Sequence, residues 1–221
     1  VFCTIMGTLI GVGRVSHNAL ARGLGYAYTE LFRNVPVLLQ LLIWYVLLVE
    51  FMPDSQSPLH FNDWFYLSKN GISVPVPVWD PSVHGLVWDV PIWFDGEITQ
   101  GISLTPEFLA ITLGLSFYTS AFVAEVVRAG IVSVPRGQLE AAKSIGLSNW
   151  QTTRQVLLPQ AMRVIIPPLT NQYLNLTKNS SLAVAIGYPD LVSISNTALN
   201  QTGRAIECIA LVMLIYLSLS L

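Results

Sequence analysis

The stretch Gly137–Pro159, GQLEAAKSIGLSNWQTTRQVLLP, is the one long polar helical segment in a chain otherwise made of apolar runs. Its local chemistry predicts two short helices. The first is expected to stop at Gly146, because glycine readily adopts the left-handed backbone that ends a helix. The sequence Ser148–Gln151 is typical of a capping box, which would open the second helix. Pro159 is expected to lie beyond the end of that second helix.

The composition surrounding this stretch indicates a membrane protein. Of the 221 residues, 52% are hydrophobic and only 11% are charged, whereas soluble domains usually carry about 25% charged residues. The net charge of −2 gives no bulk basic signal for nucleic acid. Cys3 and Cys208 both lie in apolar runs, so no disulfide framework is expected. His17, His60 and His84 are scattered without metal-ligand spacing, so no metal site is expected.

Five apolar stretches predict an all-α membrane protein with about five spans in this chain, at residues 1–12, 35–49, 108–131, 164–186 and 208–221. A membrane span needs ~20 residues. Residues 1–12 are too short to span alone, and the chain opens on Val1 and ends on Leu221 inside apolar runs, so we expect it to be a fragment of a longer protein whose outer spans are cut.

Charge predicts the orientation of these spans. The segment 14–33 and the segment 128–163 are basic, whereas 53–106 is acidic. Because cytoplasmic loops of membrane proteins carry an excess of lysine and arginine, both basic segments are expected in the cytoplasm. The domain prediction follows: two spans with a basic connection in 1–52, an acidic extracytoplasmic insert in 53–106, and a core in 107–221 with a cytoplasmic loop at 133–160.

The insert is rich in proline, tryptophan and acid; its carboxylates are Asp54, Asp63, Asp80, Asp89, Asp95 and Glu97. The alternating run Ile72–Val78 could form strands. Pro75 and Pro77 restrict these strands to sheet edges or irregular structure, because proline cannot donate to a ladder. We expect an ordered insert lying against the membrane surface, where its tryptophans would sit.

The densest polar cluster in an apolar setting consists of Asn171, Asn175, Thr177, Lys178, Asn179, Ser180 and Ser181. A lysine at the centre of a span costs ~2.5–3.5 kcal/mol on insertion scales, so this cluster predicts a gate or a surface for a polar substrate. Pro167 and Pro168 lie just before it and are expected to kink the span. The alternative is that Lys178 reaches the outer interface with its long side chain.

Other charged and small residues give weaker signals. Glu125 and Arg128 are spaced i, i+3 and can form an ion pair, which would either neutralise two charges at the membrane edge or belong to the translocation path. Arg33 is interpreted as a cytoplasmic anchor at the start of a span. Gly7, Gly11 and Gly13 have a spacing suited to helix packing.

The polar stretch has a known counterpart. Glu140, Ala141 and Ala142, then Gly146, then Val156–Pro159 resemble the EAA loop of importer-type ABC transporter permeases. The resemblance implies the type I ABC importer transmembrane fold, in which this loop docks into a groove on a cytoplasmic ATPase subunit. It assigns ATPase coupling to Gly137, Glu140, Ala141, Ala142, Gly146 and Pro159. The alternative is an amphipathic surface hairpin without a partner.

Further segments resemble the polar amino acid branch of these permeases: Tyr173–Leu182, Gly187–Leu191, Phe32–Pro36 with Asn34 in place of the usual glycine, and Ala121–Gly130. The long insert is similar to that of general L-amino-acid permeases. The resemblance implies a multi-pass protein of a bacterial inner (plasma) membrane. It also implies a cytoplasmic ATPase, a second permease subunit, an extracytoplasmic substrate-binding protein, an amino acid substrate and membrane lipid as partners.

The predicted function is therefore the permease subunit of an ATP-driven amino acid importer, which forms the translocation path and is not itself an enzyme. The chain has no phosphate-binding loop, so ATP is expected on the partner subunit and no cofactor on this chain. An ion-driven secondary transporter or channel is the alternative, since Lys178 in a broken helix would suit either. The EAA loop favours the importer. A membrane scaffold without transport activity is a third, weaker possibility. Which amino acid is carried, and whether the partner permease is identical, stay open.

Overall fold

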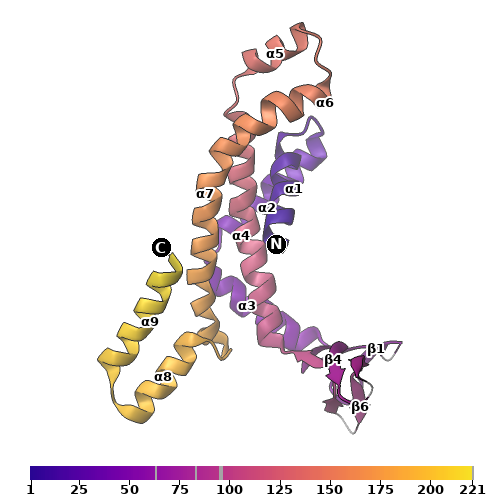
Figure 1. Cartoon of the computed structure of the whole chain (residues 1–221), viewed down its shortest axis with the longest axis vertical. Coiled ribbons are helices and arrows are strands. Elements are labelled where there is room, and N and C mark those ends of the chain that lie inside the picture. The colour runs from indigo at the N-terminus through magenta and orange to yellow at the C-terminus, as the bar shows by residue number, and fades with distance from the viewer. Residues whose placement is uncertain (63, 83, 95–96, 221) are drawn as a thin grey trace. The chain divides into compact units, whose positions relative to one another are not determined.

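The computed structural model describes residues 1–62, 64–82, 84–94 and 97–220 (Figure 1). Asp63 and Asp95, two of the predicted insert carboxylates, lie outside the described residues. The α-helices are α1 (Phe2–Val15), α2 (Ala19–Asn34), α3 (Val37–Phe51), α4 (Pro106–Val132), α5 (Arg136–Ser144), α6 (Asn149–Thr152), α7 (Leu158–Asn179), α8 (Leu191–Thr202) and α9 (Ala205–Ser220). Within the described residues, each of the five apolar stretches lies mainly on helix, as predicted, although Val35 and Pro36 fall between α2 and α3.

Helix length limits how many of these elements could cross a membrane alone. Within the described residues α4 is the one helix that is long and apolar enough. Two bent pairs pass the same test only together, α2 with α3 and residues 149–186 with α8, which raises the number to at most three. The helices α1 and α9 are apolar but shorter, at 14 and 16 residues. By length and composition the described residues thus offer at most three of the about five predicted spans, with α1 and α9 as shorter apolar helices.

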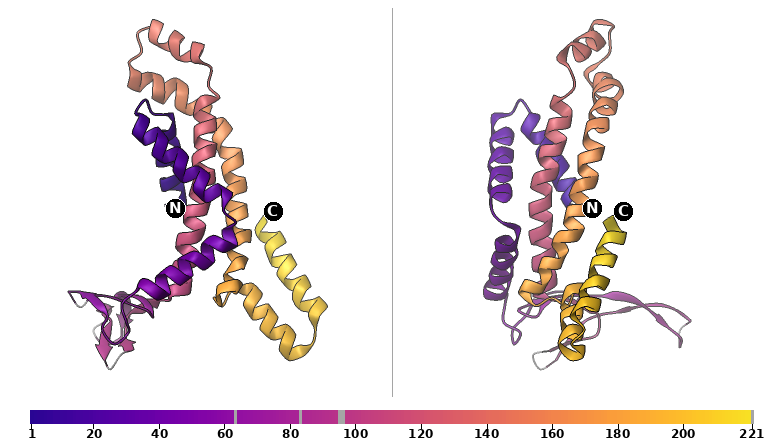
Figure 2. Two further views of the ribbon diagram at one scale, coloured as in Figure 1. Left: turned by 180° about the vertical axis from the view of Figure 1, so that it is seen from behind. Right: turned by 90° about the vertical axis from the view of Figure 1, so that its left-hand side faces the viewer.

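The chain divides into two compact units, which are described separately. The first comprises Val1–Val37, Leu115–Ser181 and Ile194–Leu221, and the second comprises Leu38–Gly114 and Leu182–Ser193. In the first unit, α4 and α7 run side by side in both views of Figure 2. Their shared core contains Val123 and Val127 from α4 and Ala161 and Ile165 from α7.

Glycines set the spacing of the helices in this first unit. A Cβ on Gly7 would lie 2.6 Å from the Cβ of Val123, and one on Gly11 would lie 2.6 Å from the carbonyl oxygen of Ala124. The backbone of α1 is therefore in direct contact with α4, which is the close approach that small residues permit in membranes. Gly13 does not share this role, because the nearest atom to its Cβ position is 3.9 Å away.

The polar hairpin is closed by the two local signals that the sequence predicted. Gly146 has φ of +87°. The N–H of Leu147 donates to the carbonyl of Ala142 at 3.1 Å, which completes a Schellman motif at the end of α5. Ser148 Oγ accepts from the N–H of Gln151 at 3.3 Å, and Gln151 Oε1 accepts from the N–H of Ser148 at 2.9 Å. Both the left-handed stop and the capping box are confirmed.

Beyond α6 the chain stays helical, so the prediction that Pro159 lies past a helix end is wrong. A π-helical turn, Thr153–Leu157, joins α6 to α7 without a break. The N–H of Leu158 donates to the carbonyl of Thr153. Pro159 follows in the first turn of α7, where its missing N–H is tolerated because the wider turn has already shifted the hydrogen-bond pattern.

Prolines inside α7 likewise do not end the helix. Pro167 and Pro168 both lie within it, so the carbonyls of Arg163 and Val164 lack the usual N–H donor four residues on. The helix tightens only at its far end. Residues Ser180–Ile186 form a 3-10 helix after Asn179.

The second unit contains the acidic insert and pairs strands in antiparallel fashion. One four-stranded sheet has the order β1-β2-β3-β8, and β4-β5 and β6-β7 form two separate two-stranded sheets. The strands are β1 (Leu59–Phe61), β2 (Phe65–Ser68), β3 (Gly71–Val74), β4 (Val76–Asp80), β5 (Gly85–Asp89), β6 (Ile92–Phe94), β7 (Glu97–Thr99) and β8 (Ile102–Leu104). Pro75 separates β3 from β4, and Pro77 lies in a two-stranded ladder, in which both strands are edges.

Packing of α1 on α4 gives a first test. Gly11→Ala would place a methyl group against the Ala124 carbonyl, so we expect the free energy of unfolding to fall by about 1–3 kcal/mol, seen as a lower melting temperature in detergent. Gly13→Ala is the matched control. Because alanine is favoured over glycine in a helix by ~1 kcal/mol, it should leave stability equal or higher. Equal losses in both variants would contradict the close approach at Gly11.

Candidate functional site

The hairpin of α5 and α6 carries the residues that the resemblance assigned to ATPase coupling, except Pro159, which lies in the first turn of α7. Gly137, Glu140, Ala141, Gly146 and Pro159 are exposed. These residues are therefore free to meet another chain, and Glu140 carries the negative charge of this group.

Ala142 differs from the rest of this group. Its residue is only 4% exposed, so its small side chain serves packing inside this chain. The expectation that Ala141 and Ala142 both present a small surface to a partner is therefore corrected to Ala141 alone.

The structure adds two apolar residues to this hairpin that the sequence reasoning did not assign. Ile145 is 79% exposed and Trp150 is 70% exposed, one on each side of the turn at Gly146. They are the two most exposed large apolar side chains of the hairpin. The signal in the sequence was their position, because both interrupt the longest polar stretch of the chain.

On α7 the polar cluster separates into two groups. Thr177 Oγ1 donates to the carbonyl of Tyr173 at 3.1 Å, Ser180 Oγ to that of Thr177 at 2.7 Å, and Ser181 Oγ to that of Lys178 at 2.7 Å. These three hydroxyl protons therefore satisfy the carbonyls of the same helix where it tightens into the 3-10 turn. The sequence, which counted hydroxyls and amides together, did not predict this division.

The second group forms a stripe that we name the amide-lysine stripe: Asn171, Asn175 and Lys178. They are spaced i, i+4 and i+7, so they share one face of α7, and all three are exposed in this single chain. Asn179, the remaining member of the predicted cluster, is half-buried. Its two amides and its ammonium group can donate to a carboxylate, and the two amide oxygens can accept from an ammonium group.

Lys178 borders a groove of about 710 Å³ in the first unit. The other residues lining it all come from α9, among them Met213 and Leu217. Within the described part of the chain no carboxylate lies within 4.0 Å of the Lys178 ammonium. Among the described residues, Lys178 therefore borders this groove and has no carboxylate partner.

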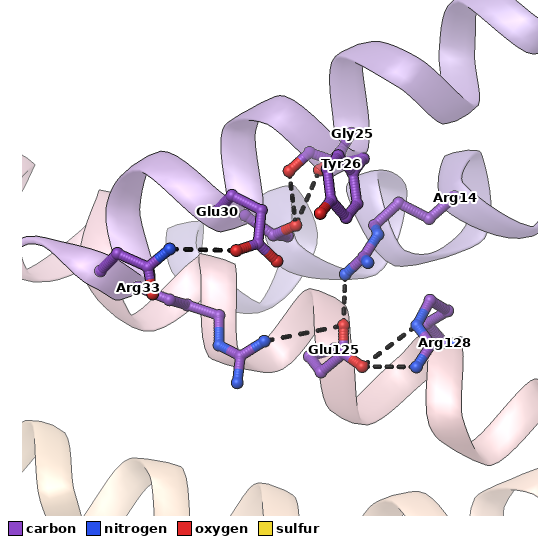
Figure 3. Close-up of polar contacts among 9 residues, drawn as sticks. Arg14, Gly25, Tyr26, Glu30, Arg33, Glu125 and Arg128 are labelled. Carbon is purple, nitrogen blue, oxygen red and sulfur yellow. Dashed lines mark hydrogen bonds and ion pairs between the residues drawn. The ribbon is translucent and has the colours of Figure 1, made fainter.

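A second polar group surrounds Glu125 on α4, where the sequence predicted a pair with Arg128. The Arg128 guanidinium donates to Glu125 Oε1 at 2.5 and 3.1 Å, and Arg14 from α1 also contacts the carboxylate (Figure 3). Arg33 from α2 has its Nη1 3.9 Å from Glu125 Oε2. Three arginines from three helices thus share one carboxylate.

The sequence did not predict that Arg14 and Arg33 would join this pair. Arg14 is the most enclosed member, with a side chain only 9% exposed, and its guanidinium lies 5.6 Å from the ring centre of Tyr26. Arg33, interpreted as a cytoplasmic anchor, lies 5.3 Å from the ring centre of Phe122. The excess of arginine over acid in 14–33 was the available signal, but the sequence could not show that these side chains converge.

Aromatic and hydroxyl contacts fix α2 against α4 and so position Arg33. The Tyr28 hydroxyl donates to the Phe117 carbonyl at 2.9 Å and lies 2.6 Å from Ser120 Oγ. Phe32 stacks on Phe117 with ring centres 5.5 Å apart. At the other end of α2, Asn18 caps the helix by accepting from the N–H of Leu20 at 2.9 Å.

The described residues contain no group of three or more His, Cys, Asp or Glu side chains that could hold a metal ion. The side chains on the surfaces described above offer charge pairing and hydrogen bonding by amides, guanidinium groups, the Lys178 ammonium and the carboxylates of Glu125 and Glu140. Such groups bind and release polar solutes or partner chains.

Comparison with known proteins adds a family. Residues 4–221 match the model of the family described as "Binding-protein-dependent transport system inner membrane component". The chain is 39% identical to the general L-amino acid transport system permease protein AapQ of Rhizobium johnstonii, with 99% of this chain and 68% of the relative covered. It is 34% identical to the glutamate/aspartate import permease protein GltJ of Escherichia coli (strain K12), covering 96% of this chain and 71% of that protein.

A solved structure agrees with these sequence matches. The chain matches the "Crystal structure of an amino acid ABC transporter with histidines" with a TM-score of 0.69 and 26% identity. The match covers 99% of this chain and 79% of that one. The resemblance to ABC importer permeases and the type I importer transmembrane fold predicted from the sequence are thereby confirmed.

The shared carboxylate gives a second prediction. A double-mutant cycle with Arg14→Gln and Glu125→Gln should show a coupling energy of about 1–3 kcal/mol, because Arg14 is enclosed and in direct contact with the carboxylate. The same cycle with Arg33→Gln should show about 0.2–1 kcal/mol, since Arg33 is more exposed and farther away. The measurement is thermal or denaturant unfolding of the four variants of each cycle. A coupling for Arg33 as large as that for Arg14 would contradict the geometry.

Proposed function

Because this chain belongs to the family of binding-protein-dependent transport system inner membrane components, we propose that it forms the translocation path of an ATP-driven importer for amino acids. It is a membrane-embedded permease subunit. The single observation that supports amino acids as the substrate is the agreement among relatives: general L-amino acid and glutamate/aspartate permeases match at 34–39% identity over almost the whole chain. This agreement also favours the importer over an ion-driven transporter or channel.

ATP hydrolysis belongs to a separate cytoplasmic subunit in this proposal, and the α5–α6 hairpin is where that subunit docks. The support comes from the surface of the hairpin. Glu140 offers a charge to a cation on the partner, Ala141 permits close approach, and Ile145 and Trp150 offer apolar area that has no cover within this chain. A charged rim with apolar anchors is the usual composition of a specific protein interface.

Docking there would act on the translocation path through a continuous helical connection. The hairpin ends in α6, which passes through the π-helical turn into α7, and α7 carries the amide-lysine stripe. The turn at Gly146 is satisfied by backbone hydrogen bonds, so the hairpin can move as a unit. ATP can drive such a motion only by binding more tightly to one of two states of the complex.

The amide-lysine stripe is the proposed substrate surface. Its amides and ammonium group match the carboxylate and ammonium of a free amino acid. In the single chain the stripe is exposed, so enclosing a path requires a second permease subunit opposite it. The acidic insert of the second unit would lie outside the membrane, where an extracytoplasmic binding protein delivers the substrate.

The substitution Glu140→Lys tests whether α5 couples this chain to the ATPase subunit. We expect this reversal of charge at the docking surface to abolish substrate-stimulated ATP hydrolysis and amino acid uptake in proteoliposomes of the complete complex, and to reduce co-purification of the ATPase subunit. Gln138→Lys is the matched control, because it adds a positive charge to the same helix at an exposed position on a different face. If Glu140→Lys transported as well as Gln138→Lys, α5 would not be the coupling element.

Lys178→Ala tests the substrate surface. Hydrogen bonds to charged groups contribute about 1.5–3 kcal/mol, so we expect uptake in the same proteoliposomes to fall by about ten- to a hundredfold while the ATPase subunit stays bound. Arg204→Ala is the control, since Arg204 is an exposed cation before α9 and outside the stripe. Unchanged uptake and substrate profile in Lys178→Ala would remove Lys178 from the path.

A further inference from the structure

A second pocket of the first unit lies apart from the amide-lysine stripe and from the coupling hairpin. It has a volume of about 410 Å³ and is lined by Arg14, Ala19, Arg22, Gly23, Tyr26 and Arg128. The end of α1, the start of α2 and the later part of α4 form its walls. Half of its lining residues are therefore arginines, from three different helices.

The charge of this pocket is not balanced within the described chain. Glu125 contacts Arg14 and Arg128, and it also lies 3.9 Å from Arg33 outside the pocket lining. Among the described residues no carboxylate lies within 4.0 Å of Arg22. Glu125 thus contacts two of the three arginines that line the cavity and is also close to Arg33 outside it. A site with an excess of positive charge is selective for an anion.

The shape of the pocket leaves room beside the arginine that has no counter-charge. Ala19 and Gly23 flank Arg22 on α2 at three residues before and one residue after it. Apart from the chain neighbours of Gly23 and the nearby backbone of its own helix, no described heavy atom lies within 4 Å of the position that a Cβ of Gly23 would take. Guanidinium groups present a planar fork of donors, which fits two oxygens of a phosphate group at once.

The pocket also lies at the cytoplasmic ends of its helices, where phosphate ions and phospholipid head groups are available. Arg14 is in the last turn of α1, and Arg128 is four residues from the end of α4. Both ends face the cytoplasm by the excess of basic residues in segments 14–33 and 128–163. Basic pockets between transmembrane helices on the cytoplasmic side are known to hold anionic lipid head groups.

We propose that this pocket binds a phosphate group, with Arg22 as the arginine that no described carboxylate pairs and with Arg14 and Arg128 held in place by Glu125. The phosphate has two sources, an anionic phospholipid head group of the cytoplasmic leaflet or a free phosphate ion. The site differs from the substrate path and from the ATPase interface, so it stands whether or not the proposed function does.

The test uses the complete transporter complex and a matched pair of variants. Arg22→Gln removes the arginine without an acidic partner, and Arg163→Gln removes an exposed arginine of α7 outside the pocket. In one arm, native mass spectrometry titrates phosphatidylglycerol against phosphatidylethanolamine onto the delipidated complex. In the other arm, inorganic phosphate is titrated and the melting temperature is followed. A third variant, Gly23→Leu, fills the pocket while keeping every charge.

The expected result is that Arg22→Gln and Gly23→Leu weaken anion binding about tenfold, whereas Arg163→Gln matches the unmodified complex. Selective loss of phosphatidylglycerol identifies the lipid head group, and loss of the phosphate-induced melting shift identifies the free ion. If the Arg22→Gln variant does not assemble into the transporter complex, the anion binding of the Gly23→Leu variant decides whether the pocket is the site. The proposal would be overturned if Gly23→Leu bound phosphatidylglycerol and inorganic phosphate as tightly as the unmodified complex. It would also be overturned if Arg22→Gln and Arg163→Gln changed anion binding equally.

Discussion

The first unit depends on the close approach of α1 and α7 to α4. Lipid tails are as apolar as leucine, so helices in a membrane gain little from burying apolar surface and associate through tight packing instead. Gly7 and Gly11 bring the backbone of α1 against α4, and Gly130 of α4 leaves room for the Ile165 side chain of α7. A Cβ at Gly7 or Gly11 would lie 2.6–2.7 Å from a backbone oxygen of α4, so a side chain at either position would push α1 away from α4.

This packing explains how one carboxylate can organise three arginines. Arg14 reaches Glu125 because the glycine face of α1 places the last turn of that helix beside α4. Arg33 arrives from α2, which the aromatic contacts of Phe32 and Phe117 hold in position. Without Glu125 the same geometry would concentrate like charges, so packing and charge are coupled in this part of the fold.

Features set by neighbouring residues were predictable, and features set by distant ones were not. The stop at Gly146 and the capping box at Ser148 follow from residues within one turn, and both were predicted. The burial of Ala142 depends on how the hairpin folds back, and the contact of Arg14 with Glu125 joins residues 111 positions apart. Pro159 was misplaced because proline marks either a first turn or a stop, and a π-helical turn decided between them.

That π-helical turn sets the angular phase between two surfaces. Each residue of an α-helix turns ~100° about the helix axis. A π-helical turn accommodates one extra residue, so the side chains of α7 are rotated by about that angle from the directions they would have if α6 continued as an uninterrupted α-helix. The direction in which the hairpin faces and the direction in which Asn171 and Lys178 face are thus related by the number of residues in this segment. The number of residues in the π-helical turn, more than the identity of its side chains, therefore sets the direction of the hairpin relative to that of the amide-lysine stripe.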